Sequence, residues 1–155
     1  MAERKAKRAV SANALDLLIR EILFAYFRLN ASGERMFAPL GQTPGKVSLM
    51  RSLLEGPQSV AQIARARPVA RQAVQRMADE LAAAGQIEYV ENPSHRRAKL
   101  ARLTDKGRKL VHEAMAEELA WAGKLARLFS EREVAIARDV VVRLTRAVVE
   151  ADART

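Results

Sequence analysis

The stretch "RQAVQRMADELAAAG", residues 71–85, decides the fold of the middle of the chain. Apolar side chains recur in it at three- and four-residue steps, and a glycine follows the last of them. This pattern is typical of a helix with one apolar face that ends at a glycine. The apolar positions are Val74, Met77, Ala78 and Leu81, and the exposed face is expected to carry Arg71, Gln72, Gln75 and Arg76.

The segments on either side of this helix predict a winged helix. "SVAQIARA", residues 59–66, has the spacing of a capping box, which predicts a short helix a few residues upstream. Two short helices so closely spaced form a helix-turn-helix. "QIEYVEN", residues 86–92, and "AKLARLT", residues 98–104, alternate as strands do and flank a turn. A hairpin after a helix-turn-helix is a wing.

The remaining segments are predicted to be helical, and the helices outside residues 43–104 are long and amphipathic. The first runs from about Ala12 to Asn30 and is ended by the polar, glycine-containing segment "NASGERMFAPLGQ". Thr43-Pro44 begins the next helix, which stops at Gly56-Pro57. Towards the C-terminus a helix from Asp105 to about Phe129 precedes a last one that begins at a capping box, residues 130–133.

The predicted fold class is therefore mainly α with a small β-hairpin wing, in one domain that spans residues 1–155. The terminal helices, residues 11–30 and 105–151, carry more apolar surface than one small head requires. A second copy of the chain is the natural partner for that surface, so we expect a homodimer.

Charge points to an anionic partner. The chain has 155 residues, a net charge of +9 and a pI near 10.6. Between Arg65 and Arg108 ten Lys or Arg face five Asp or Glu, a local excess of five. Residues 1–10 are basic as well, and this arm either contacts the anionic partner, which is a nucleic acid, an acidic membrane surface or an acidic protein, or is disordered.

Several classes of protein are not expected. No apolar run is long enough to span a bilayer, and no apolar signal-peptide core follows the basic start, so we expect a cytoplasmic protein. The absence of cysteine excludes disulfides and thiol-based sensing. We find no phosphate loop, nucleophile elbow or metal-ligand cluster, and expect neither an enzyme, a cofactor nor a metal.

The order of these segments resembles the multiple antibiotic resistance regulator (MarR) family of bacterial transcription factors. "RQAVQRMADELAAAG" is similar to its recognition helix, usually S-R-Q-x-V-x-R-x-(V/I)-D-x-L-x-x-x-G. "NPSHRRAKLARLTDKG", residues 92–107, is similar to its wing signature, D-x-R-x-x-x-(L/V)-x-L-T-x-x-G. The resemblance covers nearly the whole chain. It implies a dimeric regulator, typically a repressor, that binds a pseudo-palindromic operator in double-stranded DNA.

The resemblance assigns DNA-binding roles to both elements. On the recognition helix, Arg pairs bidentately with guanine and Gln with adenine in the major groove. On the wing, Arg97 matches the arginine that enters the minor groove, and Arg96 and Lys99 are expected to contact phosphates. His95 stands where the family usually has Asp, and Ala70 where it has Ser or Thr. Protonation of His95 near neutral pH would add a charge facing phosphates, although a tolerated turn residue is the simpler interpretation.

The resemblance also implies a pocket for a small aromatic ligand between the dimer helices and the head. Its candidate lining is Tyr26, Met36, Phe37, Met50 and Trp121. The same residue types at helical spacing are typical of an ordinary core.

Two other functions remain open at this point. A solvated charged face and a charged hairpin tip that prevents edge-to-edge pairing explain the same residues without DNA. A winged-helix module that binds proteins would bind its partner with an affinity that does not depend on salt concentration. For a protein that binds nucleic acid or anionic membranes through charge alone, the affinity would fall steeply with salt concentration, and there would be no base preference.

Overall fold

The computed structural model describes residues 10–66, 69–93 and 98–154. These residues fall into two compact units, Met1–Ala114 and Met115–Thr155, and each is described by itself. The first unit contains α1 (Ala12–Phe37), a short 3-10 helix (Ala38–Leu40), α2 (Pro44–Ser52), α3 (Val60–Arg65), α4 (Arg71–Ala83), β1 (Ile87–Val90), β2 (Leu100–Leu103) and the start of α5 (Asp105–Ala126). The second contains the rest of α5 and α6 (Glu131–Asp152).

The helix starts follow the capping signals of the sequence. The Thr43 hydroxyl accepts the Lys46 N–H, with Pro44 at the first helical position. Ser59 and Gln62 form the predicted capping box at α3, and Ser130 and Glu133 form the one at α6. Each box satisfies backbone N–H groups that have no partner within the helix.

A glycine ends α4 as expected. Gly85 has a φ of +67°, a conformation that costs glycine little. The Gln86 N–H donates to the Leu81 carbonyl and the Gly85 N–H to the Ala82 carbonyl, each over 2.9 Å. These two bonds form a Schellman motif, which turns the chain directly from α4 into β1.

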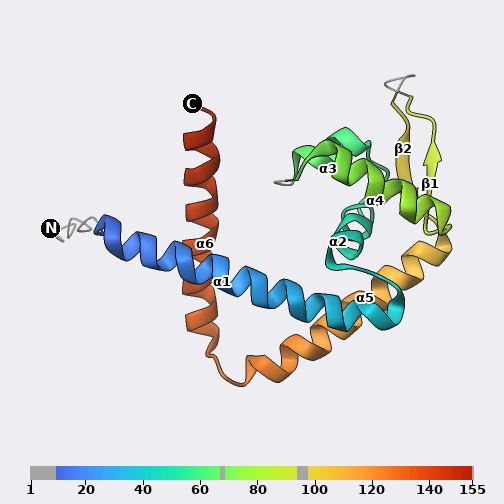
Figure 1. Ribbon diagram of the computed structural model, residues 1–155. Coiled ribbons are helices and arrows are strands. Elements are labelled where there is room, and N and C mark those ends of the chain that lie inside the picture. Colours follow the sequence, from blue (N-terminus) through green and yellow to red (C-terminus); the bar gives the residue numbers. More distant parts are fainter. Residues whose placement is uncertain (1–9, 67–68, 94–97, 155) are drawn as a thin grey trace, which may run out of the picture. The chain divides into compact units, whose positions relative to one another are not determined.

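β1 and β2 form the predicted antiparallel hairpin, with Ile87 paired to Leu103 and Val90 to Leu100 (Figure 1). An isolated bridge adds Gln58 to its other edge: Gln58 and Ala101 exchange backbone hydrogen bonds of 3.1 and 2.8 Å. The segment before α3 therefore anchors the wing to the helix-turn-helix. The fold class predicted from the sequence is confirmed.

The core of the first unit lies where α2, α3, α4 and the hairpin meet. It is formed by Leu49, Met50, Leu53, Val60, Ile63, Val74, Ala78, Leu81, Ile87, Ala101, Leu103 and Val111. All of these side chains are aliphatic or methionine, and they come from six consecutive segments. The helix-turn-helix and its wing thus share one core, which fixes α4 relative to the base of the hairpin.

The predicted end of the first helix was wrong. α1 continues past Asn30 and through Gly33 to Phe37. A Cβ at Gly33 would lie 2.9 Å from Cγ of Pro44, so glycine permits α1 and the start of α2 to approach. The Phe37 ring is 5% exposed. Its burial contributes roughly 1.5–3 kcal/mol, which outweighs the helix cost of about 1 kcal/mol for a glycine.

The long helices leave much apolar surface uncovered within one chain. Phe37 is the only buried residue of α1, and α6 has no buried residue among those the structure describes. α5 ends at Ala126, three residues before the predicted Phe129, and its buried residues all lie in its first half. In the described part of the chain no helix combines the length and apolar character that crossing a membrane requires.

Candidate nucleic-acid interface

α4 presents the two faces that its sequence predicts. Val74, Ala78 and Leu81 are buried in the core. The side chains of the opposite face are all exposed, namely Arg71, Gln72, Gln75 and Arg76. Because the buried face is held by the shared core, the exposed residues have a fixed position beside the wing.

The first turn of α4 has no side-chain cap. Ala70 occupies the N-cap with extended backbone, and no side chain there accepts a hydrogen bond from the helix. A serine or threonine at this position would accept one. The N-terminus of α4 therefore keeps its partial positive charge for an external anion.

Gln75 is bound to the wing by a hydrogen-bonded triangle. Its Nε2 donates to Asp79 Oδ1 over 2.9 Å and to the Tyr89 hydroxyl over 3.1 Å. The Tyr89 hydroxyl donates to the same Asp79 oxygen over 2.8 Å. Two residues of α4 and one of β1 thus hold one another at the protein surface.

This environment raises the pKa of Tyr89 to about 12. Partial burial of the ring is the main cause. The hydrogen bond that the hydroxyl donates to Asp79 and the negative charge of that carboxylate add to it. Tyr89 therefore stays protonated, and a donor to Asp79, throughout the neutral range. Residues 79 and 89 were not singled out from the sequence, where Tyr89 reads only as an inward position of an alternating strand.

Arg76 lies next to a carboxylate, that of Glu80, which already forms an ion pair with Lys46. Glu80 Oε2 is 2.9 Å from Lys46 Nζ of α2, whereas Glu80 Oε1 is 4.0 Å from Arg76 Nε. The hydrogen bond and charge of Lys46 lower the pKa of Glu80, with a smaller contribution from the charge of Arg76. The Arg76 side chain is 77% exposed, so its guanidinium remains available to an anion.

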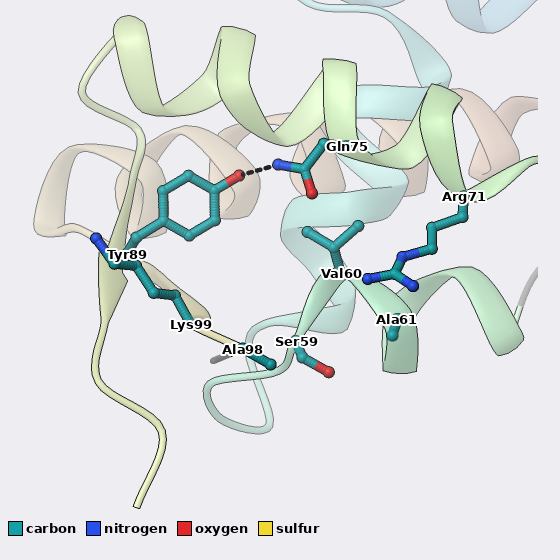
Figure 2. Close-up of a pocket in the computed structure, with 8 residues that line it drawn as sticks. All are labelled: Ser59, Val60, Ala61, Arg71, Gln75, Tyr89, Ala98 and Lys99. Atoms are coloured by element: carbon teal, nitrogen blue, oxygen red, sulfur yellow. Dashed lines mark hydrogen bonds between the residues drawn. The ribbon is translucent and has the colours of Figure 1, made fainter. Parts of the chain in front are cut away.

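A hollow of about 270 Å³ separates α4 from the hairpin. Figure 2 shows Arg71 and Gln75 of α4 on one side of it and Tyr89 of the hairpin on the other, whereas the side chain of Lys99 extends past Tyr89 and away from it. Its floor is formed by Ser59, Val60 and Ala61 at the start of α3, with Ala98 beside Lys99. Two basic residues, Arg71 and Lys99, thus line this concave surface, and the Arg71 guanidinium lies over its floor.

Hydrogen bonds connect the start of α5 to the turn between α4 and β1. The Thr104 hydroxyl is within hydrogen-bond distance of the Gly85 and Gln86 carbonyls, at 2.8 and 3.1 Å, and accepts the Gly107 N–H at 3.1 Å. Lys106 Nζ donates to the Ala84 carbonyl over 2.7 Å. The segment "LTDKG" thus closes the turn between α4 and β1 while it starts α5.

The wing tip is only partly described. Lys99 is exposed just before β2, whereas His95, Arg96 and Arg97 lie outside the described residues. Arg102 is engaged with its cross-strand partner, since its guanidinium binds Glu88 at 2.9 Å. The expectations for residues 95–97 stay predictions.

The five candidate ligand-pocket residues occupy different surroundings. Met50 belongs to the main core and is fully buried. Phe37 packs with Val47 and Ala114, and Met36 lies against that cluster. Tyr26 of α1 is 60% exposed. Trp121 belongs to the second unit, so the shared pocket stays a prediction.

The described part of the chain contains no cluster of metal ligands. Nowhere in residues 10–66, 69–93 and 98–154 do three or more His, Asp or Glu side chains gather as a metal site requires.

Comparison with known proteins finds the same architecture. The sequence model of the MarR family matches residues 41–98. An uncharacterized protein of Mycobacterium tuberculosis is 31% identical over 116 residues, which are 75% of this chain and 81% of that protein. The crystal structure of a MarR family transcription regulator is 25% identical, with a TM-score of 0.80 over 92% of this chain and 95% of that one. A mutant of MarR from E. coli, complexed with operator DNA, is 20% identical, with a TM-score of 0.76 over 88% of this chain and 99% of that one.

Proposed function

This chain belongs to the MarR family of winged helix-turn-helix transcription regulators, and from that membership we propose that it is a homodimeric, sequence-specific DNA-binding repressor. The observation that carries the proposal is the exposed polar face of α4, held by the core beside a wing base that carries Lys99. DNA in a bacterial cytoplasm is its proposed partner.

In the proposed complex α4 enters the major groove. Arg71 and Gln75 face the hollow that the hairpin borders, where they can reach base edges. Arg76, which projects from the same face, and the uncapped N-terminus of α4 bind phosphates. The wing follows the backbone, with Lys99 and Arg96 on phosphates and Arg97 in the minor groove.

The uncovered apolar surface supports the homodimer. Large apolar side chains are exposed along α1, such as Leu17, Phe24 and Phe27, and along α6, such as Ile136 and Val149. Monomeric proteins rarely leave so much apolar surface in water. A two-fold dimer through these helices would present two α4 helices to half-sites about 10 base pairs apart.

Release from DNA would follow from a change in the spacing of the two heads. A small aromatic ligand has this effect only if it binds one dimer geometry more tightly than the other. Loss of correct spacing removes base contacts in both half-sites at once, and transcription resumes.

Selection from a random duplex pool by the purified protein tests the proposal. We expect a pseudo-palindrome to be enriched, and light scattering to give the mass of two chains. If no motif is enriched and binding vanishes with added salt, the protein binds DNA through its charge alone, and the proposal is wrong. The absence of any DNA binding would favour a protein-interaction module instead.

A further inference from the structure

Lys46 is placed beside α4 by the start of α2. Its backbone N–H donates to the Thr43 hydroxyl over 3.3 Å, in the first turn of the helix. The preceding residue, Gly45, packs against α4, since a Cβ there would lie 3.0 Å from Sδ of Met77. The Lys46 side chain is only 24% exposed, whereas lysine side chains usually lie in water. The start of α2 therefore holds this cation against α4.

The Lys46 ammonium binds the carboxylate that follows Arg76 by one helical turn. Its Nζ lies 2.9 Å from Glu80 Oε2, while Arg76 Nε lies 4.0 Å from Glu80 Oε1. The pKa of Glu80 is lowered mainly by the hydrogen bond and the charge of Lys46, and least by the charge of Arg76. Glu80 is thus paired across two helices, and Arg76 is at the limit of ion-pair distance.

Without Lys46 the nearest cation to Glu80 would be Arg76. Residues four apart are neighbours on the surface of a helix, and opposite charges there attract each other. A guanidinium can bind a carboxylate through two parallel N–H groups. An Arg76 side chain bound in this way has fewer donors for a DNA phosphate, and the charge of the pair is zero.

We propose that Lys46 keeps Arg76 free to bind DNA, because it holds the Glu80 carboxylate in an ion pair with α2. The proposal rests on the proposed function and adds a positioning residue to it. Lys46 does this without touching DNA, since its ammonium faces Glu80. The start of α2 thereby contributes to the affinity of α4 for phosphates.

Lys46→Met removes the cation and keeps much of the apolar stem. On the operator selected by the wild type, at about 0.1 M salt, we expect this variant to bind about 3- to 10-fold more weakly. The loss is of this size because one charge-assisted phosphate contact is weakened. Base preferences should not change, since phosphate contacts do not read sequence. Lys124→Met on α5 removes the same charge and should bind as the wild type does.

Glu80→Gln separates an effect through Glu80 from a direct contact of Lys46. Glutamine keeps the shape of the side chain but has no charge to attract Arg76. In this background Lys46→Met should have no further effect, so the double variant should bind DNA as tightly as the wild type. If the loss persists in the double variant, Lys46 contacts DNA itself or only supports the fold, and the proposal is wrong.

Arg76→Ala shows whether Glu80 acts on Arg76. In this background Lys46→Met should again have no further effect, because no guanidinium is left to be captured. If Lys46→Met weakens binding as much as it does in the wild type, Glu80 acts by repelling phosphates, and the positioning of Arg76 is refuted. Circular dichroism shows that each variant is folded, and Lys46→Gln replaces Lys46→Met throughout if the latter does not fold.

Failure of the proposed function has a separate signature. A wild-type protein that selects no motif gives no operator, and the proposed function fails before any variant is measured. A wild-type protein that selects an operator, with a folded Lys46→Met variant of equal affinity, retains the function and loses only this proposal.

Discussion

Gly107 of α5 packs against the carbonyl oxygen of Gln86 so closely that a Cβ at residue 107 would overlap it. The carbonyl belongs to the turn between α4 and β1, and the Thr104 hydroxyl lies against the same oxygen. The glycine of the "LTDKG" segment therefore sets how closely the turn between α4 and β1 approaches α5.

Gly107→Ala should consequently destabilise the protein by about 1–3 kcal/mol, since backbone on both sides must shift. Gly123→Ala in the same helix is the control, because a Cβ there meets nothing within 4 Å. We expect it to be neutral or stabilising by roughly 0.5–1 kcal/mol. Urea unfolding followed by circular dichroism measures both. Equal effects would contradict the close contact at Gln86.

Acid should weaken the capping box at the start of α6, because it protonates the Glu133 carboxylate. The Ser130 hydroxyl and backbone N–H both donate to the Glu133 carboxylate and lower its pKa. The pKa is lower in the folded state, so this stabilisation is complete above the ordinary value of 4.5 and is lost as pH falls through the folded value.

The difference in unfolding free energy between the wild type and Glu133→Gln should therefore shrink on acidification. The capping box at α3 provides the comparison, since its third residue is the uncharged Gln62. Ser59→Ala should cost about 1 kcal/mol at every pH in this range. A difference for Glu133→Gln that stays constant or grows in acid would show that the carboxylate is not stabilised by Ser130.

Alkali should break the triangle of Gln75, Asp79 and Tyr89. The Tyr89 pKa is raised to about 12 from 10.0, so the folded state holds the proton more tightly than the unfolded state does. The stabilisation is complete below about pH 10 and is lost as pH rises towards 12. Ultraviolet titration of the wild type and Tyr89→Phe should differ by one phenol with a midpoint near 12. A midpoint near 10 would mean that Tyr89 is neither buried nor bonded to Asp79.

The sequence predicts the parts of this fold that depend on local signals. The Thr43-Pro44 start, both capping boxes and the glycine after α4 act within a few residues, so each can be identified from spacing alone. The same holds for the exposed face of α4, because its apolar positions determine which side is buried.

Contacts between distant segments could not be predicted in this way. From the sequence alone, Gly33 indicates that α1 ends near it, because the contact between Gly33 and Pro44 is not visible there. The burial of Phe37 outweighs the low helix propensity of that glycine. The bond from Gln75 to Tyr89 joins residues 14 apart on a helix and a strand, where neither the helical nor the strand period applies. Its only trace in the sequence is a tyrosine at an inward position of an alternating strand.

Lys99 is expected to bind a phosphate and therefore to contribute to salt dependence without reading bases. Lys99→Ala should reduce the slope of log affinity against log salt by about 1 and leave base preferences intact. Lys124→Ala on α5, outside the head, is a charge-matched control that should leave the slope unchanged. An altered base preference in Lys99→Ala would instead place this lysine on a base edge.

The most direct measurement of the central claim is a base-preference profile of the selected operator for the wild type, Arg71→Ala and Arg97→Ala. We expect Arg71→Ala to relax discrimination at one base pair of each half-site by about 1–3 kcal/mol. Arg97→Ala should lower affinity without changing major-groove preferences. Profiles that keep their preferences in Arg71→Ala would contradict the assignment of α4 as the helix that reads DNA.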